Sequence, residues 1–245
     1  MVSGTTSFDH MVVCKSYLLT LPKVVIPAFA VGRTQELLAR INDLVEAGRL
    51  DGVPVYVDSP MAIEATRAFT VHPEAFSAEA RRLLQAGDTP LDFEGLTLTR
   101  TVDQSRAINE DRSPAVIISA SGMCTAGRVK HHLKHNIADA RSTVLFVGYQ
   151  ARETLGRVIQ SGVTPVRIHG EWFDVRASIE TIDGFSAHAD REELLGWFAG
   201  LEGRPRATYV VHGEEDTSLT FAKTLRERFD AEVIVPRLGQ TVDLT

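Results

Sequence analysis

The chain has 245 residues, of which 44% are hydrophobic and 24% charged, and its formal net charge is −6. These values are ordinary for a soluble globular protein and exclude a disordered chain, a collagen-like repeat and a coiled coil. The length fits one large domain or two modest ones, and no apolar run approaches the ~20 residues that a membrane helix needs. Cys14 and Cys124 are too few for a disulfide framework or a cysteine-rich zinc site, so we expect a cytoplasmic protein without membrane contact.

Charge is distributed unevenly along the chain. Residues 169–245 carry 15 acidic side chains against 8 basic ones, whereas residues 112–167 carry 8 basic side chains against 2 acidic ones. A local basic surface on an acidic protein attracts a polyanion while the whole chain stays soluble. A solvated helix face that carries Lys and Arg explains the same count equally well. The charge alone leaves both interpretations open.

Between Lys23 and Ser161, short apolar runs alternate with segments of helical periodicity. The runs predict strands at residues 24–30, 53–57, 96–101, 115–120 and 144–149. The periodic segments predict helices at 34–47, 59–68, 77–86, 105–109, 127–136 and 154–161, with Ser59 as an N-cap before Pro60. This alternation predicts an α/β fold with a parallel sheet covered on both faces.

The pattern changes after Gly162. Three short strands at residues 166–168, 171–175 and 177–182 suggest antiparallel hairpins, followed by a helix (190–198), a strand (208–211), a helix (219–229) and a strand (233–236). We therefore expect a boundary near Val163, with one domain over residues 23–162 and a second over residues 163–245. Residues 1–22 fit neither domain and are poorly specified.

Two loops have the composition of an anion site. Ser119-Ala120-Ser121-Gly122-Met123 follows a buried strand, and Gly127 and Arg128 open the next helix. Free backbone N–H groups at a helix N-terminus favour an anion, and an arginine adds a bidentate phosphate contact. Pro27 to Thr34 repeats the design with Gly32 and Arg33, although a tight turn that needs glycine explains either loop as well. Asp58 ends a third strand, where we expect it to form hydrogen bonds at a helix entry.

Two histidines lie where an element changes. His188 lies among small residues between a strand and a helix, with Ser186 two positions earlier, and His212 ends an apolar strand before Gly213. A histidine in such a place suits a metal ligand or a general acid, although each alone is more often structural. By contrast, His131, His132 and His135 lie beside Lys130 and Lys134, so we interpret that helix face as basic and in contact with solvent or phosphate.

These segments together resemble a known family. Val25 to Leu38 resembles the opening of the β-CASP domain of RNA-processing nucleases in the metallo-β-lactamase superfamily. The segments 55–62 and 119–128 follow in the family's order, Asp183 to Asp190 looks like its motif B, and Val210 to Glu214 like its motif C. The resemblance runs from about Lys23 to the end of the chain. It implies a parallel-sheet β-CASP domain followed by the C-terminal part of a metallo-β-lactamase (αββα) fold.

The resemblance also implies roles for named residues. The substrate would be RNA, hydrolysed by an endo- or 5′-exoribonuclease in which two zinc ions bridge the attacking water. His212, in motif C, would be a zinc ligand, and His188, in motif B, a general acid or a stabiliser at the scissile phosphate. The residues that would bind phosphate or line the RNA groove are Ser186, Arg33, Ser119, Ser121, Gly122 and Arg128.

One departure from the family pattern affects the expected activity. The family's main zinc motif, His-x-His-x-Asp-His, does not occur in this sequence, and residues 1–22 are too short to supply it. Since catalytic zinc needs about three protein ligands, we expect the chain to represent the β-CASP domain and the C-terminal return of the lactamase fold, inactive by itself. We also expect exposed sheet edges in residues 163–245, which would favour a homodimer or poor solubility.

Two other functions remain as alternatives. A metal-free relative of the same family would bind RNA or act as a scaffold through the basic stretch. An unrelated α/β hydrolase or nucleotide-binding enzyme is disfavoured, because the sequence has neither a Gly-x-Ser-x-Gly elbow nor a P-loop.

Overall fold

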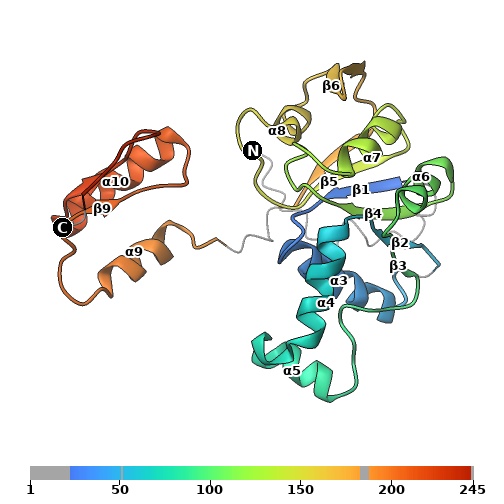
Figure 1. Cartoon of the computed structure of the whole chain (residues 1–245), viewed down its shortest axis with the longest axis horizontal. Coiled ribbons are helices and arrows are strands. Elements are labelled where there is room, and N and C mark those ends of the chain that lie inside the picture. The colour runs from blue at the N-terminus through green and yellow to red at the C-terminus, as the bar shows by residue number, and fades with distance from the viewer. Residues whose placement is uncertain (1–22, 51, 183–187, 244–245) are drawn as a thin grey trace. The chain divides into compact units, whose positions relative to one another are not determined.

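A computed structural model of the chain describes residues 23–50, 52–182 and 188–243. The chain divides into two compact units, one ending at residue 185 and the other beginning at residue 186 (Figure 1). The poorly specified segment 1–22 lies outside the described residues. Among the described helices, none combines the length and the hydrophobicity that crossing a bilayer requires.

The first unit is built on a six-stranded parallel sheet with the strand order β3-β2-β4-β1-β5-β8. Val25 of the central strand lies opposite Ile117 on one side and Val144 on the other. The expected α/β fold with a parallel sheet is therefore confirmed. The strands are β1 (Lys23–Pro27), β2 (Val55–Val57), β3 (Leu96–Leu98), β4 (Ala115–Ser119), β5 (Thr143–Phe146) and β8 (Ser178–Thr181).

Helices connect these strands close to the predicted positions. Ser59 caps α4 as predicted, because its hydroxyl accepts a hydrogen bond from the Ala62 N–H at 3.3 Å. Thr101 and Gln104 form a reciprocal capping box at the start of α6. The helices are α3 (Arg33–Glu46), α4 (Pro60–Val71), the 3₁₀ turn η1 (Pro73–Ala75), α5 (Ala78–Gln85), α6 (Val102–Glu110), α7 (Val129–Asn136) and α8 (Leu155–Gln160).

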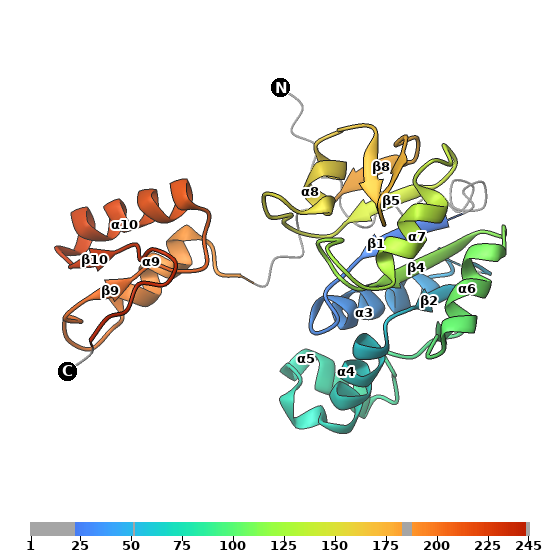
Figure 2. The ribbon, with the colours of Figure 1, turned by 45° about the horizontal axis from the view of Figure 1, so that its top comes forward.

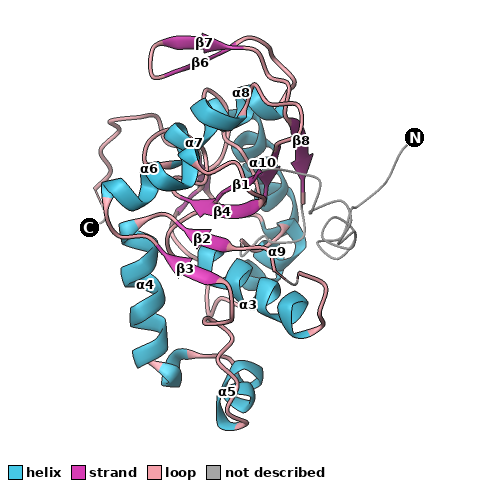
Figure 3. Ribbon diagram, turned by 90° about the vertical axis from the view of Figure 1, so that its right-hand side faces the viewer, coloured by secondary structure: helices cyan, strands magenta, loops and turns pink. Residues whose placement is uncertain are grey.

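Alternating side chains of the strands form two cores, one on each face of the sheet. Val24 and Ile26 pack with Leu37 and Leu38 of α3, whereas Val25 faces the other way, toward Leu133 of α7. Figure 3 shows the sheet between α3 and α4 on one side and α6, α7 and α8 on the other. Because both faces are covered, the strands read as continuous apolar runs, which is why the sequence revealed them.

The prediction of successive antiparallel hairpins after Gly162 is only half right. β6 (Val166–Ile168) and β7 (Glu171–Phe173) form an antiparallel hairpin, but β8 pairs in parallel with β5 and extends the main sheet. Ile179 of β8 packs on one core and Ile182, just after the strand, on the other. Burial on both faces of the parallel sheet, which a local pattern does not reveal, determines where this strand pairs.

The second unit contains α9 (Arg191–Ala199), β9 (Thr208–Tyr209), α10 (Glu215–Phe229) and β10 (Val233–Ile234). β9 and β10 pair in parallel, and α10 lies beside them (Figure 2). The small core consists of Leu195, Phe198, Ala222, Leu225 and Val233. Both predicted helices are present, although α10 begins four residues earlier than predicted.

Candidate functional site

The loops predicted to bind anions lie at the same edge of the sheet. They follow β1 and β4, which are adjacent strands, and the loop after β5 lies on the other side of β1. Because all three strands are parallel, their carboxyl ends meet at one edge, the position where α/β proteins most often bind ligands. This edge is the first candidate site.

A buried carboxylate, Asp58 at the end of β2, organises this edge. Its side chain is completely buried and receives hydrogen bonds from four donors that belong to β3, α6 and α7 or their flanking loops. Thr99 Oγ1 and Arg128 Nη1 donate to Oδ1, each at 2.6 Å. Ser105 Oγ lies 2.5 Å from Oδ2, and His132 Nε2 lies 2.7 Å from the same oxygen.

These bonds keep Asp58 ionised inside the protein. Burial by itself raises the pKa of this carboxyl group, but the hydrogen bonds from the surrounding side chains outweigh burial and hold its pKa well below the ordinary value. The Asp58 network is thus much more than the helix-entry hydrogen bond expected from the sequence. It ties β2, the loop after β3, α6 and α7 together beneath the candidate site.

Arg128 and Ser119 are part of this scaffold. The Arg128 guanidinium donates to Asp58 and to the carbonyl oxygens of Thr99 (3.2 Å) and Arg100 (2.9 Å). The Ser119 hydroxyl is 1% exposed and donates to the Asp58 carbonyl oxygen at 2.8 Å. In this structure both side chains hold the loop from below.

The loop from Ser121 to Arg128 is closed by its own hydrogen bonds. Ser121 Oγ accepts from the N–H groups of Thr125 (3.1 Å) and Ala126 (3.4 Å), and the Ser121 N–H donates to the Ala126 carbonyl oxygen. These N–H groups, which were expected to be free for an anion, are therefore paired within the loop. Gly127 has φ +81°, and a side chain there would collide with the Ala120 carbonyl oxygen.

The second loop places Arg33 at the start of α3. Its guanidinium pairs with Glu36 at 2.7 Å and is 12% exposed. Gln35 fixes the loop from inside, since its Oε1 accepts from the Gly32 N–H at 2.7 Å and its Nε2 donates to Thr66 Oγ1 at 2.8 Å.

Gln150, which the sequence analysis did not single out, holds the β4 and β5 loops together. It is 3% exposed, and its Nε2 donates to the Gly122 carbonyl oxygen at 2.9 Å. Its Oε1 occupies the space where a side chain on Gly156 would be, so a larger residue at that position would displace the Gln150 amide. A polar residue directly after an apolar strand, followed by glycine six residues later, is too common a pattern to predict this contact.

The interpretation of the α7 histidines as one basic face is wrong for His132. Its ring is fully buried, with Nδ1 2.9 Å from Asn109 Oδ1 and Nε2 on Asp58. His131 and His135 are exposed, and His131 stacks on His169 with ring centroids 4.4 Å apart. The apolar residues of α7 carried a signal for this, because Val129, Leu133 and Ile137 recur at helical spacing and place His132 on the buried stripe.

His188 and His212 lie in the second unit, and the structure brings them together. Their ring centroids are 6.4 Å apart, and both residues are exposed. His188 precedes α9, whose start is fixed by a capping box between Asp190 and Glu193, and His212 lies between β9 and α10. Ser186, the predicted phosphate ligand, lies outside the described residues.

His212 has a positive φ of 65°, a conformation that a non-glycine residue adopts at a cost of about 1–3 kcal/mol. Strain of this kind gathers at functional sites. The next residue, Gly213, cannot carry a side chain without approaching Ser218 Oγ to 2.5 Å. The turn therefore presents the His212 imidazole beside His188.

The histidine pair does not complete a zinc site by itself. A catalytic zinc usually has three protein ligands, and the described residues contain no cluster of three His, Cys, Asp or Glu side chains. Cys124 adds no ligand, since it is fully buried and burial raises the pKa of its thiol to about 12. A metal at this position would require further ligands.

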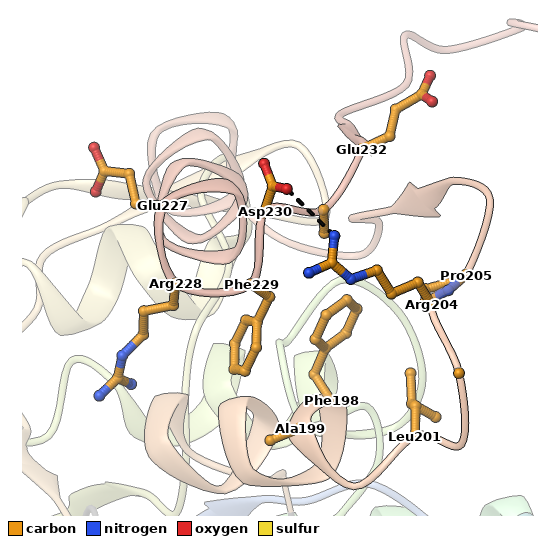
Figure 4. Close-up of a pocket in the computed structure, with 12 residues that line it drawn as sticks. Phe198, Ala199, Leu201, Arg204, Pro205, Glu227, Arg228, Phe229, Asp230 and Glu232 are labelled. Atoms are coloured by element: carbon orange, nitrogen blue, oxygen red, sulfur yellow. Dashed lines mark hydrogen bonds and ion pairs between the residues drawn. The ribbon is translucent and has the colours of Figure 1, made fainter.

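The second unit also has a pocket of about 560 Å³, away from the histidines (Figure 4). Phe198 and Phe229, with ring centroids 5.1 Å apart, form its floor, and Arg204 pairs with Asp230 at 3.3 Å on its rim. The pocket lies at the C-terminal ends of α9 and α10, whereas His188 and His212 precede the N-terminal ends of these helices. We therefore do not assign it to the candidate site.

The chain thus combines a parallel α/β unit that has clustered loops with a small unit that holds a pair of histidines. Two family models match the chain accordingly. The "Beta-Casp domain" matches residues 34–159, and the "Zn-dependent metallo-hydrolase RNA specificity domain" matches residues 168–236. The chain therefore belongs to the β-CASP family of the metallo-β-lactamase superfamily, as the sequence indicated.

Named relatives are similar to most of this chain. "Ribonuclease TTHA0252" of Thermus thermophilus is 40% identical over 223 residues, which cover 90% of this chain and 49% of the relative. "Transcription termination factor FttA" of Methanocaldococcus jannaschii is 37% identical over 220 residues, covering 87% of this chain and 34% of the relative. The factor of the same name from Pyrococcus abyssi is 36% identical over 228 residues. The chain spans about a third to a half of the length of these relatives.

Replacing the buried carboxylate should destabilise the first unit. We expect Asp58→Asn to lower the free energy of unfolding by about 3 kcal/mol, because removing one partner leaves the Arg128 charge buried without its counter-charge. Urea denaturation at pH 7 measures this loss. Asp103→Asn, at a side chain that is 93% exposed, is the control and should cost less than about 1 kcal/mol.

The same carboxylate makes the stability depend on pH. Because its pKa is lowered on folding, its contribution is complete above the unfolded pKa of about 3.9 and is lost as the pH falls below that value. Below that pH, the free energy of unfolding of the wild-type chain should fall by up to about 1.4 kcal/mol per pH unit through this group. Asp58→Asn should not show this part of the loss. If the difference in the free energy of unfolding between the wild type and Asp58→Asn stayed constant from pH 6 to pH 3, the lowered pKa of Asp58 would be contradicted.

Two neighbouring histidines on α7 test which face of the helix is buried. We expect His132→Ala to cost more than about 2 kcal/mol, because it removes a bond to a buried carboxylate and leaves a cavity. His131→Ala should cost less than about 1 kcal/mol, since that ring is exposed. Equal losses in thermal or urea unfolding would show that His132 is not part of the core.

Proposed function

We propose that the chain is the β-CASP and C-terminal part of a zinc-dependent hydrolase that cleaves RNA phosphodiester bonds. The observation that carries this proposal is the pairing of His188 and His212, which follow one another by 24 residues in sequence and lie with ring centroids 6.4 Å apart. The zinc-dependent metallo-hydrolase model over residues 168–236 and the ribonuclease name of the Thermus relative support it.

The residues divide into two roles in this proposal. His212 contributes one ligand to a metal site that further residues complete, and His188 holds a proton near the leaving oxygen of the scissile phosphate. A zinc pair, when bound, supplies a hydroxide nucleophile and neutralises developing negative charge. Ser186, Arg33, Ser121 and Gly122 contact RNA, while Ser119 and Arg128 fix the loop that bears Ser121 and Gly122.

We further propose that the 245-residue chain binds RNA but does not cleave it. Among the described residues, only His188 and His212 come together at this position, and no cluster of three potential ligands is present, whereas a catalytic zinc usually has three. Binding needs only the loops of the first unit. Its affinity should fall with salt, with a logarithmic slope of about −0.7 for each phosphate contacted in a single strand.

A chimaera tests the hydrolase proposal. The part of the Thermus ribonuclease that this chain does not match is fused to the chain, and zinc content and cleavage of a labelled RNA are measured. We expect bound zinc and hydrolysis, a loss of zinc in His212→Ala, and a rate reduced about 10²–10⁴-fold in His188→Ala. His72→Ala, an exposed histidine of the first unit, is the control and should change neither quantity.

The outcomes separate the hydrolase from its alternative. A folded chimaera that binds RNA but never cleaves it, with or without zinc, would favour the metal-free RNA-binding relative. Cleavage by the unfused chain with stoichiometric zinc would overturn the proposed inactivity and support the hydrolase. Absence of RNA binding by both proteins at low salt would overturn both functions.

A further inference from the structure

The edge of the sheet that carries the candidate loops also exposes aromatic side chains. Phe29, two residues after β1, is 50% exposed, and Tyr149, three residues after β5, is 59% exposed. β1 and β5 are adjacent parallel strands, about 5 Å apart, so both residues leave the sheet at the same edge. A single exposed aromatic residue is ordinary, but two that leave adjacent strands at the edge where α/β proteins bind ligands point to a binding surface.

The glycine loop joins the two aromatic positions. A Cβ on Gly122 would lie 2.9 Å from Phe29 Cδ2 and 3.1 Å from Cε2, so the absent side chain lets the Phe29 ring lie directly on the loop. On the other side, the Gly122 carbonyl oxygen accepts the hydrogen bond from Gln150, the neighbour of Tyr149. Phe29 and Tyr149 therefore flank Gly122. The Phe29 ring is held by its contact with Gly122, and the backbone at Tyr149 is held by the hydrogen bond from Gln150.

The charges along this edge of the sheet permit a polyanion. Asp58 is buried and matched by Arg128, Glu36 is paired with Arg33, and Glu64 is paired with Arg100. In the β5 loop, Arg152 balances Glu153. An approaching phosphate backbone thus meets a locally neutral edge rather than a field of negative charge.

We propose that Phe29 and Tyr149 form a stacking platform for unpaired RNA bases, an assignment that rests on the proposed RNA-binding function. Aromatic side chains stack on bases of any sequence because every base has a π-face, and a held ring loses little conformational entropy on binding. The platform binds the bases of a single strand while the neighbouring loops contact its phosphates. It gives a preference for single-stranded RNA over duplex without reading a sequence.

The test compares two probes of equal length and charge. One is a fluorescein-labelled ten-residue oligouridylate, and the other is the same ribose-phosphate chain without bases. Fluorescence anisotropy should show that Phe29→Ala and Tyr149→Ala each weaken binding of the oligouridylate about 5- to 100-fold and leave binding of the abasic chain unchanged.

Matched variants separate stacking from folding. Phe29→Leu keeps an apolar contact with Gly122 but has no ring, and it should lose affinity as Phe29→Ala does. Phe29→Tyr and Tyr149→Phe keep the ring and should bind like the wild type. Trp172→Ala is the control for an exposed aromatic residue, because Trp172 is 66% exposed in β7, which precedes β8 and so lies toward the opposite edge of the sheet.

Four outcomes would overturn the platform. Equal losses with both probes would mean that the variants disturb phosphate contacts. Unchanged RNA affinity would leave the proposed function standing and remove the platform. Unchanged affinity together with a dimer that Phe29→Ala converts to a monomer in light scattering would show that these rings form a contact between copies of the chain. Failure of the wild type to bind either probe would overturn the proposed function as well.

Discussion

The buried ionised carboxylate of Asp58 is the constraint on which the first unit depends. An unpaired charge in this position would be prohibitively costly, so the chain must bring to it the arginine that precedes α7 and a histidine of α7. Meeting that requirement fixes α7 relative to β2 and β3, and with α7 it fixes the loop from Ser119 to Arg128. The ion pair and hydrogen bonds of Asp58 therefore determine the shape of the candidate edge. The apolar contacts of the two cores stabilise the sheet itself.

The sequence revealed the parallel sheet because its strands are apolar on both faces, and it revealed helix starts such as α4 because Ser59 caps locally. It could not reveal β8 as a sheet strand, since pairing with β5 is a long-range choice. The same holds for the site. Glycine and arginine marked the loops, and position in the chain marked His188 and His212. Arg128 points inward because it bonds to Asp58, which lies 70 residues away in the sequence. A local sequence pattern cannot predict such a contact.

Buried glutamines extend the same principle to the loops. Gln35 and Gln150 each hold the backbone of a neighbouring loop from inside, and Gly156 and Gly122 are small because a glutamine and a phenylalanine occupy the adjoining space. The Gln35 amide both accepts and donates in this task, whereas Gln150 acts through its Nε2 donor. Gly122, a predicted phosphate-binding position, is thus also a packing position.

This organisation separates positioning from chemistry. In the first unit, polar side chains under the surface bond to one another, and the rings of Phe29 and Tyr149 are exposed at the edge. In the proposed function this surface holds a strand rather than breaks a bond. In the second unit, two accessible imidazoles lie beside a strained turn, with little buried polar structure around them among the residues described. A group that must exchange protons or bind a metal benefits from access, whereas a group that orients a flexible strand benefits from rigidity. In the proposed function, the two units meet these opposite requirements by different means.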